Sequence, residues 1–98
     1  MPSLIEKTIA ELANYDQPIL NSGLAELSNL TSAEMEHFKQ SWPSIEVKRR
    51  RQIIYRLIEL AEDNLELNFD CILKYCLKDA DDEVQTKAIE GLWENEEP

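Results

Sequence analysis

Residues 44–63 read SIEVKRRRQIIYRLIELAED, and this stretch decides the fold class. Its apolar residues recur every three or four positions, which is the spacing of a helix with one buried face. They are Ile53, Ile54, Leu57, Ile58, Leu60 and Ala61. Ser44 is a good N-cap residue, so the sequence predicts a helix that begins there and ends near Asp63.

Helical spacing continues on both sides of this stretch. Thr31-Ser32-Ala33-Glu34 has the capping-box pattern and predicts a helix that begins at residue 31 or 32. Pro43 ends that helix, because a proline further along it would remove a backbone hydrogen bond. Asp16 is a candidate N-cap for a short helix with Pro18 in its first turn. The expected helices are residues 3–14, 18–27, 31–42, 44–63, 69–78 and 82–93, and the expected hairpins are 3–28, 31–63 and 69–94.

The composition agrees with one all-α domain. The 98 residues are 43% hydrophobic and include 2 glycines and 4 prolines, too few turn formers for a many-stranded sandwich or barrel. Helices joined by short linkers pack as antiparallel neighbours, so we expect about six helices in antiparallel pairs across residues 1–98. Three stacked hairpins favour a right-handed α-solenoid, and a compact orthogonal bundle is the alternative.

Charge and hydropathy exclude some classes of partner. The chain has 10 Lys and Arg against 20 Asp and Glu, a formal charge of -10 that opposes the phosphate backbone of nucleic acids. Its apolar runs are far shorter than the ~20 residues that span a bilayer. Charged residues also interrupt the N-terminal segment where a secretory leader needs an apolar stretch. We therefore expect a cytoplasmic protein that binds neither nucleic acid nor membrane.

The two cysteines offer no obvious chemistry. Cys71 and Cys76 are five residues apart in one expected helix. That separation points them roughly 140° apart, which excludes a disulfide between them. No histidine lies nearby in the sequence, because the single one is His37. Both cysteines are therefore expected as reduced thiols in the core.

The acidic segment at residues 79–83 resembles the start of a metal-binding loop. Asp79, Asp81 and Glu83 have the oxygen spacing that opens a calcium-binding EF-hand, but Val84 stands where that loop needs glycine. We therefore expect a solvated acidic turn at a helix N-terminus, where carboxylates interact favourably with the helix dipole. The sequence predicts no metal ligand, no cofactor and no catalytic residue, and hence a protein that is not an enzyme.

Residues 79–93, DADDEVQTKAIEGLW, resemble the second half of a HEAT repeat. The wider chain resembles the N-terminal portion of bacterial HEAT-repeat domain proteins. The resemblance implies caps for the turn and the helix, an apolar anchor, and two small residues that let the neighbouring helix approach. These are Asp79, Asp82, Val84, Ala88 and Gly91, in that order. Gln85 departs from the pattern, because it stands where the repeat usually has an arginine that pairs with the acidic turn.

The resemblance also carries expectations about function. HEAT repeats imply a non-enzymatic scaffold or adaptor that presents a face of stacked helices to a protein partner. The alternative is an accessory subunit of an enzyme, resembling the HEAT-like bilin lyase subunits, in which a tetrapyrrole would occupy the groove. A resemblance to HEAT-like nucleic-acid glycosylases is disfavoured by the acidic charge.

The candidate partner-binding residues are two arginines and a tryptophan. Lys48 to Arg51 form the one concentrated positive run, and Arg49 and Arg56 share a helix face because they are seven residues apart. This face is a candidate for docking an acidic peptide or phosphate, and the alternative is internal ion pairing with Glu46, Glu59 or the acidic turns. Trp42 is expected in the core. Trp93 has helical spacing from Ile89 and is expected to pack in the core as well, but it lies near the open end. It is therefore also a candidate anchor for a partner, or for self-association through the C-terminal helix.

Overall fold

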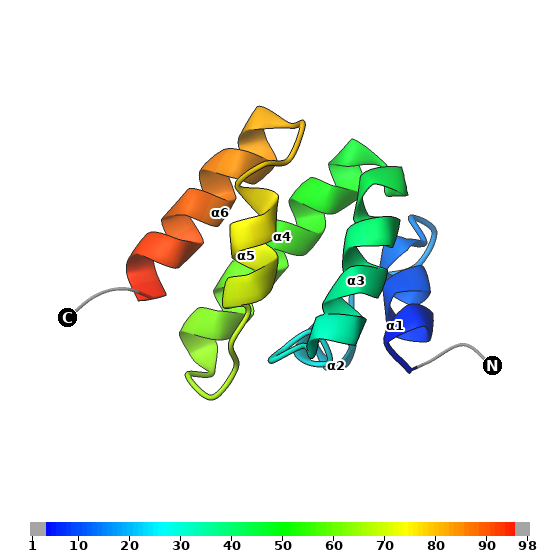
Figure 1. The fold of residues 1–98 in the computed structure, drawn as a ribbon, viewed down its shortest axis with the longest axis horizontal. Helices are drawn as coiled ribbons and strands as arrows, with labels where there is room; N and C mark the ends of the chain where they lie inside the picture. Colours follow the sequence, from blue (N-terminus) through cyan, green and yellow to red (C-terminus); the bar gives the residue numbers. More distant parts are fainter. Residues whose placement is uncertain (1–3, 96–98) are drawn as a thin grey trace.

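The computed structural model of the chain describes residues 4–95, and side chains through Trp93. These residues form six α-helices and one 3₁₀ turn and contain no β-strand (Figure 1). The elements are α1 (Leu4–Ala13), α2 (Asn21–Ala25), α3 (Ser32–Ser41), η1 (Trp42–Ser44), α4 (Val47–Asp63), α5 (Asp70–Cys76) and α6 (Asp82–Asn95). The expected all-helical fold is confirmed for this part of the chain. The cap expected at Ser3 lies outside the described residues.

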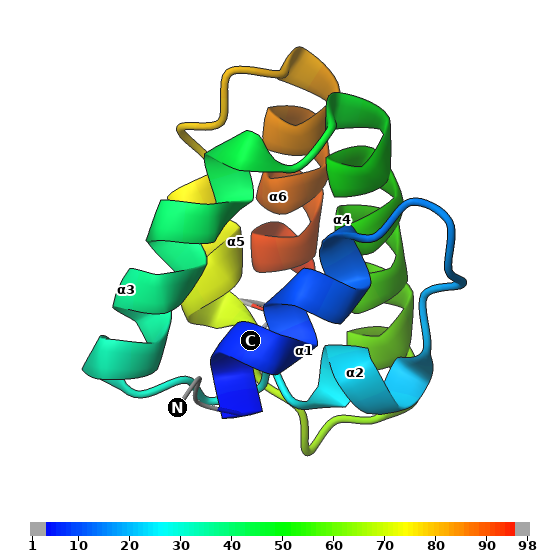
Figure 2. The same ribbon diagram turned by 90° about the vertical axis from the view of Figure 1, so that its right-hand side faces the viewer.

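The helices contact one another in two rows. In the first row α1 packs on α3 and α3 on α5, and in the second α2 packs on α4 and α4 on α6. Contacts of α1 with α2 and of α5 with α6 join the rows. Figure 2 shows α3 and α5 to one side and α4 and α6 to the other. Helix α4 also contacts α1, so it touches both the first and the last parts of the described chain.

The capping box of α3 is confirmed. The Thr31 hydroxyl accepts a hydrogen bond from the Glu34 backbone N–H at 3.2 Å, and the Glu34 carboxylate accepts one from the Thr31 N–H at 2.8 Å. These two bonds satisfy backbone donors that have no partner within the helix. Pro43 lies two residues after the end of α3, in the first turn of η1, where its lack of an N–H costs no helical hydrogen bond.

The predicted start of the long helix at Ser44 was wrong. Trp42 to Ser44 form the 3₁₀ turn, and the Ser44 hydroxyl donates to the Ser41 carbonyl at 2.7 Å. Ile45 is extended, and α4 begins at Val47 with no side-chain cap. Ser44 therefore serves the preceding turn rather than the helix that follows.

The second helix is shorter than predicted. It begins at Asn21, because Leu20 is extended and serves as the N-cap, whose carbonyl accepts from the Leu24 N–H at 3.1 Å. Asp16 therefore does not cap it. The helix stops at Ala25, and Asn29 has a positive φ of 53°, which ends any continuation towards the turn. The Asn29 N–H instead donates to the Asn68 carbonyl at 2.9 Å, which ties this turn to the segment before α5.

The core is formed by apolar side chains from both rows. Trp42 is 2% exposed and stacks on Phe38 with ring centroids 5.1 Å apart, so its expected core position is confirmed. The largest fully buried side chains are Trp42, Phe38, Phe69, Leu24, Leu27, Ile53, Ile54, Leu57, Ile72, Val84 and Cys76.

The N-cap of α6 is Asp81 and not Asp82. The Asp81 carboxylate accepts a hydrogen bond from the Val84 N–H at 3.1 Å, which is the bond from an N-cap side chain to the third residue of a helix. Asp82 is the first residue of α6 and is exposed. Asp79 does stabilise the turn, because its carboxylate accepts from the Asp81 N–H at 2.9 Å. The N-cap lies one residue before the expected position, because the hydrogen bond from the Asp81 N–H to the Asp79 carboxylate ends the turn at Asp81.

Gly91 allows α6 to approach its neighbours closely. A Cβ atom at this position would lie 3.0 Å from the Ile58 side chain and 3.1 Å from that of Leu73. Ala88, one turn earlier, is fully buried on the same face. The close approach expected at these two small residues is therefore confirmed.

Candidate functional site

The arginines of α4 divide into two groups. Arg50 and Arg51 face the turn before α6. One Arg50 nitrogen lies 3.4 Å from the Asp79 carboxylate, and Arg51 donates twice to Asp81, at 2.9 and 2.7 Å. The Arg51 hydrogen bonds lower the pKa of Asp81 to about 2 and raise the pKa of Arg51. These two arginines are therefore neutralised within the chain, as the ion-pair alternative predicted.

Arg49 and Arg56 have only neutral partners. Arg49 donates to the carbonyls of Leu12 at 2.6 Å and Gln17 at 2.7 Å, and Arg56 donates to the Asn21 side chain at 2.6 Å. Over the described residues, neither guanidinium forms an ion pair with a carboxylate. Their two positive charges are therefore not compensated by adjacent negative charges.

Arg49 and Arg56 line one hollow on the surface of α4. Its volume is about 390 Å³, and we call it the Arg49–Arg56 hollow. Its lining residues are Pro18, Ile19, Arg49, Gln52, Tyr55 and Arg56. The shared face expected from the spacing is therefore confirmed, but Arg49 is only 4% exposed and its guanidinium supports the loop after α1. Arg56 is the more accessible of the two cations.

The hollow includes residues that the sequence analysis missed. Pro18 and Ile19 come from the loop before α2, and Tyr55 comes from α4. The Lys87 ammonium of α6 lies 4.6 Å from the centre of the Tyr55 ring, although it also pairs with Glu90 at 2.9 Å. That hydrogen bond raises the pKa of Lys87. Tyr55 therefore borders both the hollow and α6.

The outer face of α6 exposes two large apolar side chains. Ile89 is 52% exposed and Trp93 is 73% exposed. They are four residues apart and so lie on one face of the helix, opposite the buried Val84 and Ala88. The core packing expected for Trp93 is therefore wrong, whereas the exposed position that an anchor needs is present, and Trp93 does not line the Arg49–Arg56 hollow.

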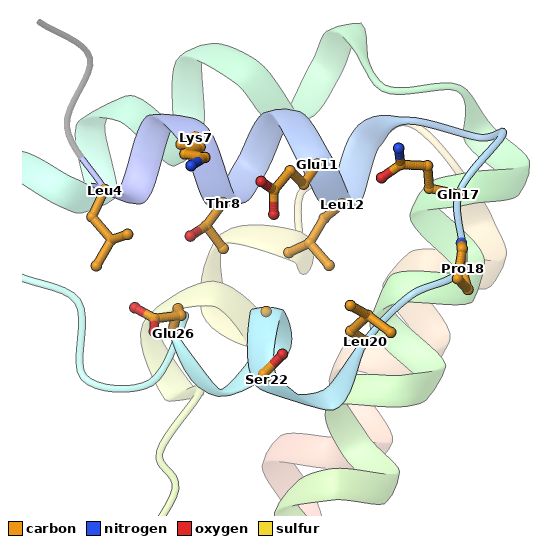
Figure 3. Close-up of a pocket in the computed structure, with 11 residues that line it drawn as sticks. Leu4, Lys7, Thr8, Glu11, Leu12, Gln17, Pro18, Leu20, Ser22 and Glu26 are labelled. Atoms are coloured by element: carbon orange, nitrogen blue, oxygen red, sulfur yellow. The ribbon is translucent and has the colours of Figure 1, made fainter.

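A groove of about 240 Å³ lies between α1 and α2. Figure 3 shows Leu4, Thr8 and Leu12 pointing from α1 towards the segment that carries α2, with Leu20 and Glu26 pointing back. The groove also has charges of both signs, because Lys7 and Glu11 line it with Glu26. It is therefore an amphipathic groove without a net positive charge.

The acidic turn is occupied by partners from within the chain. Asp79 accepts a hydrogen bond from the Trp42 indole N–H at 2.7 Å and faces Arg50. Gln85, at the position that departs from the HEAT pattern, donates to the Asp79 backbone carbonyl. The described residues contain no cluster of three or more His, Cys, Asp or Glu arranged to hold a metal ion. None of the described helices is long and apolar enough to cross a membrane.

The two cysteines differ in environment. Cys76 is fully buried, and burial raises the pKa of its thiol to about 12. Cys71 is exposed, so its predicted core position was wrong. The reason is that α5 buries Ile72, Leu73 and Cys76, and this face leaves Cys71 towards solvent.

Comparisons of the chain with protein-family models, with curated proteins and with solved structures find no match.

Proposed function

We propose that this chain is a non-enzymatic protein–protein interaction module, built as a short right-handed α-solenoid of HEAT type. The two rows of helices support the architecture, because each expected hairpin contributes one helix to each row. Stacked hairpins of this kind leave helix faces at the ends and sides for a partner.

The observation that carries the proposed function is the exposed apolar pair on α6. Ile89 and Trp93 remain 52% and 73% exposed although the core is otherwise well covered. Fully burying a large apolar side chain is worth about 1.5–3 kcal/mol, so a partner that covers both would gain binding energy. Tryptophan is also enriched among the residues that dominate protein interfaces.

The size of the α1–α2 groove disfavours a tetrapyrrole bound at that place. Its volume of about 240 Å³ lies below the roughly 300–1,000 Å³ that is usual for small-molecule sites. Such a groove fits one large side chain better than it fits a whole cofactor.

Site-specific photocrosslinking tests the proposal. A photoreactive amino acid replaces Trp93 in one version and Glu36, on the exposed side of α3, in a control. We expect a discrete crosslinked protein from position 93 and none from position 36. Trp93→Ala should weaken the complex with that protein about tenfold or more, as is usual for a central interface tryptophan.

The alternative function predicts a different result. Saturable binding of a tetrapyrrole in an absorbance titration, with no crosslink from position 93, would contradict the interaction module and favour the lyase-like accessory subunit.

A further inference from the structure

We infer that the Arg49–Arg56 hollow binds residues 93–97 of a second copy of this chain, with Trp93 against the apolar wall of the hollow and the glutamates that follow it towards Arg56. The inference rests on the proposed function, because it names the partner of the exposed α6 end. It joins two features of the surface, the accessible Arg56 that has no carboxylate partner among the described residues and the exposed Trp93.

The hollow has the chemistry for such a segment. Two guanidinium groups whose hydrogen-bond partners are all neutral border it. Glu59, three residues after Arg56, forms no ion pair with it, and neither does Asp16 with Arg49. Ile19 and Tyr55 add an apolar and aromatic wall, and arginine beside an aromatic ring suits a segment that carries both an indole and carboxylates.

The C-terminal segment has the complementary chemistry. Its sequence from residue 93 is WENEEP, so three glutamates follow the exposed Trp93 within four positions. The chain's total charge of -10 does not prevent this contact. Charges more than about 8 Å apart are largely screened at physiological ionic strength, whereas adjacent charges attract.

A second copy is needed, because the fold holds Trp93 away from the hollow of its own chain. Lys87 lies beside Tyr55, and Gly91 packs against Ile58 one helical turn further along α4. Trp93 follows Gly91 in α6, which stays helical to Asn95, and so it lies beyond the hollow on the α6 side of α4. A second molecule is therefore needed to bring Trp93 to Arg56.

The contact is heterologous, since the hollow of one copy meets the α6 end of the next. Each bound copy still presents one free hollow and one free end, so association proceeds to longer chains unless a ring closes. A symmetric pair formed through two α6 helices would stop at a dimer.

Sedimentation of complementary variants tests the inference. Arg56→Glu reverses the charge of the accessible arginine in the hollow and leaves the segment unchanged. The triple variant Trp93→Ala, Glu96→Gln, Glu97→Gln takes the indole and two negative charges from the segment and leaves the hollow unchanged. We expect the unmodified chain to form concentration-dependent oligomers that weaken at high salt, and each variant alone to be monomeric. An equimolar mixture of the two variants should form a dimer and nothing larger.

Two further variants keep the test independent of folding. Arg56→Gln keeps an amide that can bond to Asn21 and should weaken association about tenfold without lowering thermal stability. Lys7→Glu makes the same charge reversal in the α1–α2 groove and should leave association unchanged.

The outcomes separate this inference from the proposed function. A chain that is monomeric at all concentrations, or a mixture of variants that stays monomeric, overturns the inference. Loss of association in Lys7→Glu instead of Arg56→Glu also overturns it, because it moves the contact to the groove. If a different protein crosslinks at position 93 while the chain is monomeric, the inference fails and the proposed function stands.

Discussion

Asp79 connects three parts of the chain through one carboxylate. Its side chain is 4% exposed and lies beside Arg50 of α4, while the same group accepts bonds from the Trp42 indole and the Asp81 backbone. A buried carboxylate is stable only when it is paired and hydrogen-bonded. The position was predicted as a turn residue, and pairing of the basic run with the acidic turns was one of the alternatives. The bond from Trp42 could not be predicted, because Trp42 reaches Asp79 only in the folded chain.

Asp81 should make stability depend on pH in the acid range. Its folded pKa is about 2, lowered by the hydrogen bonds from Arg51, whereas in the unfolded chain it has its usual value near 3.8. The unfolded state therefore takes up a proton first, and the stabilising contribution is complete above about pH 4 and is lost as the pH falls towards 2. Urea unfolding of the native chain and of Asp81→Asn between pH 5 and pH 2 measures this contribution to the free energy of unfolding.

Asp82→Asn is the matched control for that experiment. Asp82 is the adjacent exposed carboxylate and forms no ion pair in the described structure. We expect the acid-dependent loss of stability to shrink in Asp81→Asn and to persist in Asp82→Asn. Equal pH profiles for the native chain and Asp81→Asn would contradict the assignment.

Cys71 and Cys76 should differ in reactivity. The thiolate is the reactive form, and Cys76 is buried with its pKa raised to about 12, whereas Cys71 is exposed. A thiol-reactive dye at neutral pH should therefore label one cysteine per folded chain and both in denaturant. Cys71→Ser should abolish labelling of the folded chain, and rapid labelling of that variant would contradict the burial of Cys76.

At the scale of elements, local signals predicted helices better than they predicted helix ends. The capping box at Thr31 was correct because both of its bonds are made within four residues. Ser44 and Asp82 failed as caps because a 3₁₀ turn used the first and the Asp79 turn moved the second cap to Asp81. The hollow was only half predicted, since the spacing of Arg49 and Arg56 says nothing of the Pro18 loop that completes it.

The packing of α6 on its neighbours depends on Gly91. A side chain there would press on Ile58 and Leu73 at about 3 Å. Gly91→Val should therefore lower the free energy of unfolding by about 1–3 kcal/mol, the usual cost of overpacking a tight interior. Urea denaturation measures the change.

Gly23 provides the contrasting case in α2. A Cβ atom there would lie 3.5 Å from the nearest Leu12 carbon, which is ordinary contact. Gly23→Ala should therefore stabilise the chain by about 0.4–1 kcal/mol, through the lower entropy of the unfolded state. The two substitutions should therefore change stability in opposite directions. If Gly91→Val stabilised the chain as well, the close packing of α6 at Gly91 would be contradicted.

For the whole molecule, charge repulsion should limit stability. The formal charge of -10 opposes folding into a body 42 by 27 by 25 Å across. Salt screens exposed charges more than it screens the half-buried pairs of Arg50 and Arg51. Raising NaCl from about 20 mM to about 500 mM should therefore raise the melting temperature by a few degrees.

That melting experiment is best done on Trp93→Ala, so that association between copies does not contribute. An uncharged osmolyte at equal osmolarity is the control, and it should give a smaller increase than NaCl. A melting temperature that falls with added NaCl would show that attractive pairs outweigh the repulsion.

The central place of α4 also bears on how the chain folds as it leaves the ribosome. Helix α2 packs on α4, and the loop after α1 is held by Arg49 through the carbonyls of Leu12 and Gln17. Neither contact exists until α4 has been synthesised and has emerged. The nascent chain therefore lacks these contacts, and α2 lacks its partner in the second row, until a helix that ends at residue 63 has emerged.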